Sequence, residues 1–403
     1  MRKGWIVKRL KDVCEKITDG THQTPNYFEK GVIFLSSKNV KSQKIDWDNV
    51  KYIDKKQHLE MHKRIAPRLN DILLAKNGTT GVAALVDRDV IFDIYVSLAF
   101  LRPLPIVFPL YLLNFINSPI AKKQFNKRLK GAGVPNLHLQ EIREVQLPIP
   151  PLPEQKRIVK ILDEIFTAID KAKANAEKNL SNSKELFKSY LNGVFCNRGK
   201  DWEEKKLGEV TTKIGSGATP RGGNASYKEE GISLVRSMNV HDFYFREKKL
   251  AFIDKAQADA LSNVTVQEND VLLNITGASI ARCCVIPNKY LPARVNQHVS
   301  IIRAKDDIVS PFFLNLLLTS KFYKDQLLFT GEQGATRQAV TKAQLEAFKI
   351  SIPKSLTKQK VIANKLDMLS AETKKMEFIY HQKIDALEEL KKSILKKAFK
   401  GEL

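Results

Sequence analysis

Cysteine is scarce in this chain, with four residues among 403, and their spacing fits neither a disulfide framework nor a zinc-binding pair. Cys283 and Cys284 lie in the apolar run 281–286, which favours small core residues. No stretch approaches the ~18 consecutive apolar residues of a membrane-spanning helix, and the amino-terminal segment has no apolar signal-peptide core. We therefore expect a cytoplasmic protein with no membrane association.

Motifs for chemistry are also missing from the sequence. It contains no Gly-x-x-x-x-Gly-Lys-Ser/Thr loop for nucleotide phosphates and no Asp/Asn-Pro-Pro-Tyr/Phe run for amino-methyl transfer. The segment His58-Leu-Glu-Met-His62 differs from a zinc-protease helix because Glu60 does not directly follow the first histidine, and we interpret it as a solvated helix face. We thus expect a non-catalytic chain with no metal ligands and no cofactor of its own.

Positive charge is the first signal of function. The chain has 67 Lys and Arg against 44 Asp and Glu, a net charge of +23. Such a surplus favours polyphosphate partners, because each phosphate that a cation neutralises releases condensed counterions. A generic basic surface that only maintains solubility is the alternative that composition leaves open.

The chain repeats itself over about half its length. Trp5–Val13 returns as Trp202–Val210, and Gly31–Val40 returns as Gly231–Val240. Further matches are Thr24-Pro25 with Thr219-Pro220, Asn70–Leu74 with Asn269–Leu273, and Leu147–Pro150 with Ile350–Pro353. This period is too long for a solenoid repeat, so each copy is expected to be a folded domain followed by a connector.

A long helical pattern follows the proline-rich end of each copy. Apolar residues recur there at alternating spacings of four and three, the pattern of a coiled-coil seam, and equivalent positions in the two copies differ by 204. The predicted seam comprises Ile158, Leu162, Ile165, Ile169, Leu186, Tyr190, Ile362, Leu366, Leu369, Met376, Tyr380, Leu387, Leu390 and Ile394. The shared register favours packing of the two helices against each other over two unrelated surface helices.

These patterns predict an α/β architecture in four segments, 1–150, 151–198, 199–353 and 354–403. The first and third segments are repeated α/β domains, and the second and fourth are long antiparallel helices that form a coiled coil with pseudo-twofold symmetry. The net charge is +11 for the first domain and +4 for the second. A shared skeleton with diverged charge is what we expect if each copy reads a different sequence.

Short apolar runs and proline-led helical patterns alternate inside each domain, as in an α/β fold. The strand-like runs are Val32–Leu35, Asp71–Ala75, Val82–Val86 and Ser97–Leu101, with counterparts at Ile232–Val235, Val271–Ile275, Ala281–Ile286 and Val299–Ile302. Pro109–Asn117 and Pro311–Leu318 are predicted helices, each with proline at the first helical position.

Loops between these runs carry the polar side chains that pair with base edges in the major groove. The candidate DNA-binding residues are Thr24, Lys38, Asn39, Lys76, Asn77, Thr219, Arg221, Arg236, Asn239, Asn274, Thr276, Arg337 and Gln338. For each of them an ordinary solvated loop residue or a phosphate contact is the alternative. Substitution of Arg236 by alanine is expected to weaken cognate binding more than binding to random DNA.

Several segments resemble the specificity (S) subunits of type I restriction-modification systems. Pro148–Ile158 is similar to the junction where a target-recognition domain of that family meets its spacer helix, and Glu185–Phe195 and Glu389–Phe399 resemble the helix ends. The openings at Trp5 and Trp202 resemble the start of such domains. The resemblance covers essentially the whole chain, but the second junction departs from the pattern between the proline and the glutamine of Pro-Lys-Ser-Leu-Thr-Lys-Gln.

The resemblance implies partners: double-stranded DNA with a bipartite target, two methyltransferase (M) subunits and restriction (R) subunits. S-adenosylmethionine, ATP and Mg²⁺ are then expected on the partner subunits, so that the assembled complex is an adenine-N6 methyltransferase and ATP-dependent endonuclease. The helices would act as a ruler for half-sites about one DNA turn apart, ~34 Å. The alternatives are a coiled-coil scaffold with an incidental basic surface, or a specificity chain from a fused restriction-methylation system outside type I.

Overall fold

The computed structural model describes residues 4–41, 43–78, 80–127, 136–332 and 339–403. The chain divides into two compact units, one made of residues 1–177 and 382–403 and the other of residues 178–381. Each unit therefore combines one globular domain with a segment of both long helices. Among the described residues, no helix is both long enough and apolar enough to cross a membrane.

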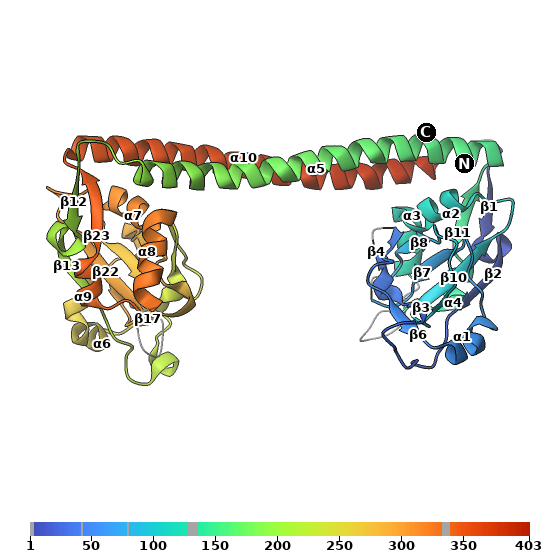
Figure 1. Ribbon diagram of the computed structural model, residues 1–403, viewed down its shortest axis with the longest axis horizontal. Coiled ribbons are helices and arrows are strands. Elements are labelled where there is room, and N and C mark those ends of the chain that lie inside the picture. Colours follow the sequence, from blue (N-terminus) through green and yellow to red (C-terminus); the bar gives the residue numbers. More distant parts are fainter. Residues whose placement is uncertain (1–3, 42, 79, 128–135, 333–338) are drawn as a thin grey trace. The chain divides into compact units, whose positions relative to one another are not determined.

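The first globular domain is a mixed α/β domain (Figure 1). Its strands are β1 (Ile6–Arg9), β2 (Cys14–Asp19), β3 (Val32–Leu35), β4 (Val40–Lys41), β5 (Lys44–Ile45), β6 (Lys51–Ile53), β7 (Ile72–Ala75), β8 (Ala83–Leu85), β9 (Phe92–Ile94), β10 (Leu98–Pro103) and β11 (Gln146–Ile149). Its helices are η1 (Leu10–Asp12), η2 (Ser37–Asn39), α1 (Lys55–His62), α2 (Pro109–Ile116), α3 (Pro119–Asn126) and α4 (Leu139–Arg143).

The central sheet of this domain has the strand order β2-β10-β7-β8, with every pair antiparallel. A second sheet, β6-β3-β9, contains the parallel pair β3 and β9. Strands β1 and β11 pair with each other, as do β4 and β5. The loops with predicted DNA-binding residues therefore follow strands of both sheets. Lys38 and Asn39 follow β3, and Lys76 and Asn77 follow β7.

The central sheet separates two hydrophobic cores. Because successive strand residues point to opposite faces, Ile72 and Leu74 of β7 pack in the core beneath α2, whereas Leu73 and Ala75 pack in the core toward the second sheet. All four side chains are buried. Burial on both faces explains why this strand is a continuous apolar run with no polar alternation.

The second globular domain repeats this plan (Figure 1). Its strands are β12 (Trp202–Lys206), β13 (Thr211–Ser216), β14 (Ile232–Val235), β15 (Val240–His241), β16 (Tyr244–Phe245), β17 (Ala251–Ile253), β18 (Thr265–Val266), β19 (Val271–Asn274), β20 (Cys283–Val285), β21 (Ala293–Val295), β22 (Val299–Ala304) and β23 (Lys349–Pro353). Its helices are η3 (Leu207–Val210), η4 (Gly223–Ser226), η5 (Ser237–Asn239), α6 (Lys255–Ala260), η6 (Ser262–Val264), η7 (Gly277–Ser279), η8 (Asn288–Tyr290), α7 (Pro311–Thr319), α8 (Lys321–Glu332) and α9 (Lys342–Ala347).

The sheet orders β13-β22-β19-β20 and β17-β14-β21-β18 match those of the first domain, with β18 as an addition. The expected fold is thus confirmed: two repeated α/β domains, each built around the same antiparallel sheet. The apolar runs at 32–35 and 232–235 form β3 and β14 with the expected bounds.

The two long helices are α5 (Leu152–Cys196) and α10 (Leu356–Ala398). In the first unit the beginning of α5 and the end of α10 share one core, which contains Leu162 and Leu395. In the second unit the end of α5 and the beginning of α10 share the other core, with Leu191 and Leu366. The helices therefore pack against each other in antiparallel directions within each unit.

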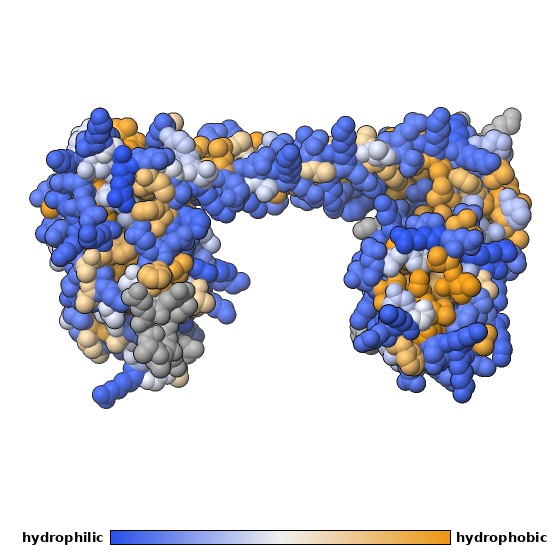
Figure 2. Space-filling view, in the orientation of Figure 1, coloured by the Kyte–Doolittle hydropathy of each residue, from blue (hydrophilic) through white to orange (hydrophobic). Residues whose placement is uncertain are grey.

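Ion pairs flank the packed helix surface of the first unit. Lys173 contacts Glu388 at 2.6 Å, and Lys391 contacts Asp170 at 3.1 Å. The pairs are solvent-exposed, so each contributes little to stability but favours one alignment of the helices. Figure 2 shows that the visible surface of both helices is mostly hydrophilic, as expected when their apolar stripes face inward.

The buried stripe differs from the predicted seam near the end of each helix. Leu186 and Leu390 are 48% and 46% exposed, and Tyr190 is 36% exposed. The buried positions lie one residue further on: they are Phe187, Leu191, Phe195, Leu395 and Phe399. Elsewhere along the stripe, Ile158, Leu162, Ile169 and Leu366 are buried, and Ile165, Ile362, Leu369, Met376, Tyr380, Leu387 and Ile394 are half-buried.

The shift has a tertiary cause. At its end each helix packs on a globular domain as well as on the other helix. Phe399 makes edge contacts with Tyr111 and Phe115 of α2, at centroid distances of 5.2 and 5.3 Å. Phe195 makes the equivalent contacts in the second unit, with Phe313 of α7 at 5.4 Å. An alternating spacing of four and three describes packing between two helices only. It therefore does not predict which residues pack against the globular domain.

A buried glutamine joins each domain to the start of a long helix. The Gln155 side chain accepts a hydrogen bond from the amide of Phe108 and donates to the carbonyls of Ile106 and Pro150. Gln359 makes the same three bonds, with Ser310, Ile308 and Pro353. The second junction therefore keeps the three hydrogen bonds of the glutamine although the sequence between the proline and the glutamine has diverged.

Candidate nucleic-acid interface

A glycine at the end of β2 and of β13 brings the following loop against the neighbouring sheet. A side-chain carbon on Gly20 would lie 1.9 Å from the carbonyl oxygen of Ile94, and one on Gly217 would lie 1.9 Å from that of Val295. Only glycine permits this approach. The loop after β2 is thereby held beside the residues that lead into β10, where polar side chains from several loops meet.

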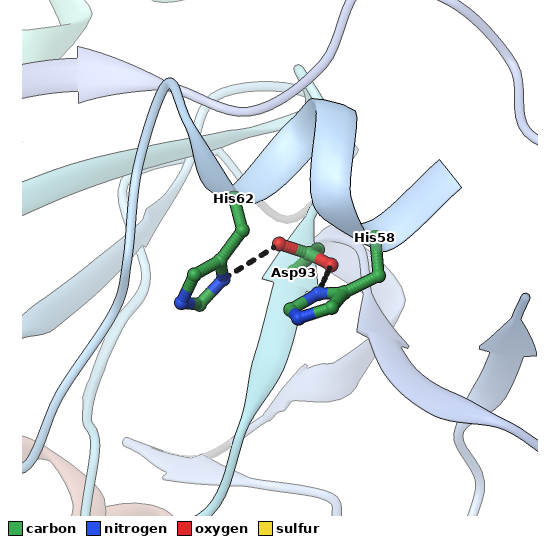
Figure 3. A group of neighbouring side chains, drawn as sticks. All are labelled: His58, His62 and Asp93. Atoms are coloured by element: carbon green, nitrogen blue, oxygen red, sulfur yellow. Dashed lines mark hydrogen bonds and ion pairs between the residues drawn. The ribbon is translucent and has the colours of Figure 1, made fainter. Parts of the chain in front are cut away.

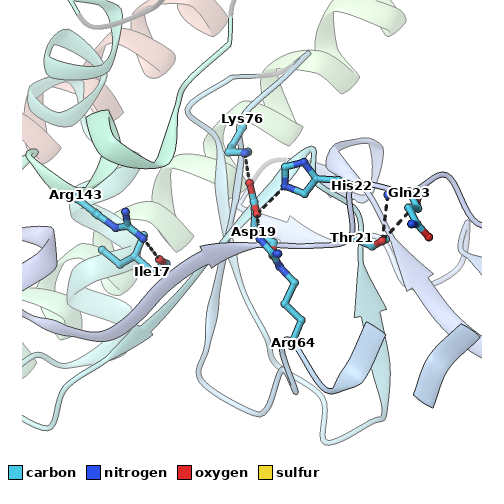
Figure 4. A network of polar contacts seen from close by, with 8 residues as sticks. All are labelled: Ile17, Asp19, Thr21, His22, Gln23, Arg64, Lys76 and Arg143. Atoms are coloured by element: carbon cyan, nitrogen blue, oxygen red, sulfur yellow. Dashed lines mark hydrogen bonds and ion pairs between the residues drawn. The ribbon is translucent and has the colours of Figure 1, made fainter. Parts of the chain in front are cut away.

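Asp19 is the centre of a polar network in the first domain (Figure 4). Its carboxylate accepts hydrogen bonds from Lys76 Nζ at 2.6 Å and from Arg64 Nη2 at 2.7 Å, and His22 Nε2 lies at 3.3 Å. Burial by itself would raise the pKa of Asp19, but the bonds to Lys76, His22 and Arg64 and the charge of Lys76 lower it below its ordinary value.

Lys76 is largely buried. Its side chain is only 8% exposed and is paired with Asp19, so in this structure it holds the base of the loop. The groups at the surface of the network are Arg64 and His22, with side chains 50% and 65% exposed. Arg64 also donates to the Asp19 carbonyl, which fixes the orientation of its guanidinium.

Two further candidates, Asn39 and Asn239, are buried supports of a turn. Each carbonyl oxygen accepts from a backbone amide three residues earlier, that of Ser36 or Arg236. Each amide nitrogen donates to backbone carbonyls of the next loop, including that of Asp46 in the first copy and Arg246 in the second. The pair is 6% and 0% exposed, so neither asparagine is available to a base edge.

The same turns present other residues to solvent. Lys38 is exposed at the first turn. In the second copy the Arg236 guanidinium donates to the carbonyl of Lys249 and lies 5.2 Å from the ring centroid of Tyr227. Arg236 is half-buried, and its Nε has no hydrogen-bond partner among the described residues.

In the second domain a cluster of threonine, glutamine and histidine side chains occupies the corresponding region. Thr276 and His298 Nδ1 are 2.6 Å apart, Gln297 Nε2 and His298 Nε2 are 3.2 Å apart, and Thr219 donates to Gln297. Asn274 lies beneath this cluster, fully buried, and donates to the Ser237 carbonyl. Asn274 is thus a support, whereas Thr219 and Thr276 are half-buried within the cluster.

Strand pairing makes the two regions directly comparable. Asp19 lies opposite Ala99, and Ser216 lies opposite Ser300, so Asp19 and Ser216 are equivalent. By the same register, Ile275 replaces Lys76: the Lys76 amide donates to the Ser97 carbonyl, and that of Ile275 to the His298 carbonyl. One frame therefore carries a network around a carboxylate in the first copy and a cluster of hydroxyl, amide and imidazole groups in the second.

The remaining candidates are placed as follows. Thr24 and Arg221 are exposed, and the Thr24 hydroxyl lies 3.3 Å from that of Tyr95. Asn77 is half-buried, and its side-chain oxygen has no hydrogen-bond partner within the described part of the chain. Arg337 and Gln338 lie outside the described residues.

Sequence reasoning missed His22, Arg64, Tyr95, Gln297 and His298. Of these, Gln297 and His298 directly precede β22 and occupy the positions of Val96 and Ser97 before β10. Comparing the residues just before equivalent strands of the two copies would have identified them. Arg64 had no such signal, because it meets Asp19 only through the fold.

The histidines of α1 are not on a solvated face as expected. Asp93 of β9 is 2% exposed, and its carboxylate oxygens lie 2.7 Å from His58 Nδ1 and 3.1 Å from His62 Nδ1 (Figure 3). The His58 side chain is 14% exposed. These three residues are the group, among those described, whose ligand atoms come close enough to hold a metal ion.

Comparison with known proteins identifies relatives along nearly the whole chain. A putative type I restriction enzyme MjaX specificity subunit from Methanocaldococcus jannaschii is 24% identical over 407 residues, covering 93% of this chain and 90% of that protein. The type I restriction enzyme EcoKI specificity subunit of Escherichia coli K12 is 21% identical and covers 100% of this chain and 89% of its own length.

Solved structures support the same fold. A chain from a study of complex assembly and conformational transition of the type I R-M system superposes with a TM-score of 0.77 at 21% identity, covering 100% of this chain and 99% of that chain. The HsdS subunit from Thermoanaerobacter tengcongensis gives a TM-score of 0.63 at 20% identity, covering 100% and 98%. The type I restriction modification DNA specificity domain matches twice, at residues 2–178 and 199–389, and the chain therefore belongs to this family of type I specificity subunits.

Proposed function

We propose that each globular domain reads one half of a bipartite target in double-stranded DNA. The observation that carries this proposal is that the two domains share the same backbone contacts but present different polar side chains at the equivalent place. Gly20 and Gly217, and also Asn39 and Asn239, keep equivalent contacts in the two copies. The polar side chains at that place have diverged, which is what recognition of two different half-sites requires.

The charge difference supports the same interpretation. The first domain carries +11 and the second +4, and the network of Lys76 and Arg64 around Asp19 contrasts with the threonine, glutamine and histidine cluster around His298. Phosphate contacts position a protein on DNA and gain from a surplus of cations, whereas base edges are read by cationic side chains and also by amides and hydroxyls. The two domains are thus proposed to differ in how much of their affinity comes from phosphates.

The proposal extends to partners and cofactors. Two methyltransferase subunits and restriction subunits would assemble on this chain and would bind S-adenosylmethionine, ATP and Mg²⁺. The chain itself would be non-catalytic and would supply specificity to adenine methylation and ATP-dependent cleavage. The continuous helices α5 and α10 would set the distance between half-sites, expected near one DNA turn, ~34 Å.

Co-expression with the neighbouring methyltransferase gene, followed by methylome sequencing, tests the proposed function. The expected result is one bipartite motif with a fixed gap, methylated on adenine in both halves. Exchange of 199–353 for the corresponding domain of another specificity subunit should change one half of the motif and leave the other half unchanged. A change in both halves would contradict the assignment of one half-site to each domain.

Direct DNA binding separates this function from that of a scaffold. Titration of the assembled complex with cognate and random duplexes at several salt concentrations should show steep loss of affinity as salt rises, because neutralised phosphates release counterions. A preference for the cognate duplex should persist at every salt concentration. A complex that assembles but has no DNA affinity would favour the scaffold.

A further inference from the structure

The cluster of His58, His62 and Asp93 has a geometry of its own. The two histidines are one turn apart on α1 and therefore project from the same face. Their rings are 4.6 Å apart between centroids, and both Nδ1 atoms point at the carboxylate of Asp93 on β9 (Figure 3). One ligand atom from each residue falls within 4.8 Å of the others.

The Asp93 carboxylate is buried and contacts two histidines of α1. It is 2% exposed, and its ion-pair partners among the described residues are the two imidazoles, which are charged only when protonated. A buried carboxylate is costly unless a positive charge compensates it. Two imidazoles and one carboxylate form a set of ligand types that a single divalent cation completes.

The second domain solves the same structural task differently. Arg294 occupies the position of Asp93, because it lies opposite Leu234 as Asp93 lies opposite Phe34. Its Nε donates to the carbonyl of Ala258, the counterpart of His58, and so attaches α6 to the sheet. Ser262 stands at the position of His62. The first copy thus has three potential ligands where the second has none.

Helix α1 depends on polar contacts for its attachment. None of its residues is buried. Asp54 caps the helix by accepting from the Gln57 amide, and the Gln57 side chain exchanges hydrogen bonds with Asn26. His58 and His62 also hydrogen-bond to Asp93 of β9 and so connect the helix to the sheet. A metal ion at this point would tie the helix to β9.

We propose that His58, His62 and Asp93 bind one divalent transition-metal ion, with Zn²⁺ the best fit. Two imidazoles and a carboxylate are typical zinc ligands, with metal–ligand distances of about 2.0–2.2 Å. Tetrahedral coordination at these distances separates ligand atoms by about 3.3 Å. The three candidate ligand atoms lie within 4.8 Å of one another, so small side-chain rotations would bring them to that spacing. Mg²⁺ and Ca²⁺ prefer oxygen ligands and fit poorly.

Solvent would supply the fourth ligand, because the side chain of His62 is 30% exposed and the cluster is open on that side. The site is assigned a structural role, which is to hold α1 in place. This position matters for the surface because Arg64, two residues beyond the helix, contacts Asp19. The metal site does not depend on the proposed DNA recognition and can be tested without DNA.

Zinc binding by the full chain tests the site. Chelator-treated protein, verified as folded by circular dichroism, is titrated with Zn²⁺ in competition with a chromophoric chelator. We expect one ion per chain to be bound at this site, an affinity lowered about a hundredfold or more in His62→Ala, and no competition from Mg²⁺. His22→Ala is the matched control, because His22 is an exposed histidine of the same domain that also contacts an aspartate. Its affinity for Zn²⁺ should equal that of the wild-type chain.

A spectroscopic measurement protects the test against misfolded variants. Co²⁺ in place of Zn²⁺ should give the strong visible absorption of a tetrahedral site, and Asp93→Asn, which preserves side-chain shape, should abolish or shift it. Unchanged Zn²⁺ affinity in both His62→Ala and Asp93→Asn would overturn the proposal. Absence of Zn²⁺ binding by the folded wild-type chain would also overturn it, and would make the cluster a hydrogen-bonded attachment like that of Arg294.

Discussion

At the scale of single residues, burial decides which polar groups can meet a ligand. Lys76, Asn39, Asn239 and Asn274 have side chains suited to DNA contacts, yet all four are buried and bonded within their own domain. The exposed groups are their neighbours, such as Lys38 and Arg64. Buried polar residues are expected to be hydrogen-bonded, so their removal should affect folding before it affects recognition.

Lys76→Met should lower the free energy of unfolding by about 3 kcal/mol at neutral pH, because it leaves the buried Asp19 carboxylate with fewer positive partners. The pKa of Asp19 is lowered in the folded state. Its pairing therefore stabilises the fold above the ordinary carboxyl pKa of about 4 and is lost as pH falls through and below that value. Urea unfolding at several pH values should show the difference between wild type and variant shrinking in acid.

The double variant Asp19→Asn with Lys76→Met serves as the control for that prediction. It removes both charges, so its stability should change less with pH between 3 and 7 than that of either the wild type or the single variant. A constant difference between Lys76→Met and wild type across this range would show that the lysine contributes through packing alone.

Gln297→Ala should weaken binding of the assembled complex to its cognate duplex by about 10- to 100-fold, because one good base contact contributes about 1–3 kcal/mol of discrimination. Gln297 is exposed and oriented by Thr219. Binding to random DNA should be unchanged. Equal losses on cognate and random duplexes in fluorescence anisotropy would instead identify a phosphate contact, and the same comparison applies to Arg236→Ala.

At the scale of secondary-structure elements, the junction between a domain and its helix depends on one buried amide. Gln359→Met should destabilise the chain by about 2–4 kcal/mol, because it leaves the Ser310 amide and two carbonyls without their partner. Gln382→Met, on the exposed surface of the same helix, should change stability by less than about 0.5 kcal/mol. Denaturant unfolding of both variants checks the prediction, and equal effects would contradict it.

The position of the helix stripe gives a second prediction at this scale. Leu191 is 3% exposed and Leu186 is 48% exposed, although the spacing pattern favours Leu186. Leu191→Ala should therefore cost about 2–5 kcal/mol, whereas Leu186→Ala should cost less than about 1 kcal/mol. A lower thermal stability of Leu186→Ala than of Leu191→Ala would instead support the seam predicted from the alternating spacing of four and three.

At the scale of the whole molecule, the proposed function makes helix length the variable that sets the gap in the target. Insertion of seven residues into both α5 and α10 keeps the buried stripe in register and lengthens each helix by about 10.5 Å. At 3.4 Å per base pair, the gap in the methylated motif should increase by about three base pairs. Methylome sequencing measures this directly, and an unchanged gap would show that the helices do not set the spacing.

The architecture follows from patterns that are local in the sequence. The repeated segments, the continuous apolar strands and the long helical spacings each depend on residues close together in the chain, and the structure places β3, β14, α5 and α10 where these patterns predict them. The family was also identifiable from such segments, because the junction and helix ends are short contiguous motifs. Each of these features is determined by backbone periodicity and by burial of apolar side chains.

The sequence by itself therefore determined the repeat, the fold class and the family of this protein. Only the tertiary structure decided which polar side chains are free. Lys76 is neutralised by Asp19, 57 residues away, and His58 meets Asp93 across 35 residues. Partners so far apart are brought together by sheet pairing and by a glycine that permits close approach, and no local pattern records which side chains meet. The physical reason is that apolar burial follows period and composition, whereas the pairing of buried charges depends on positions in space.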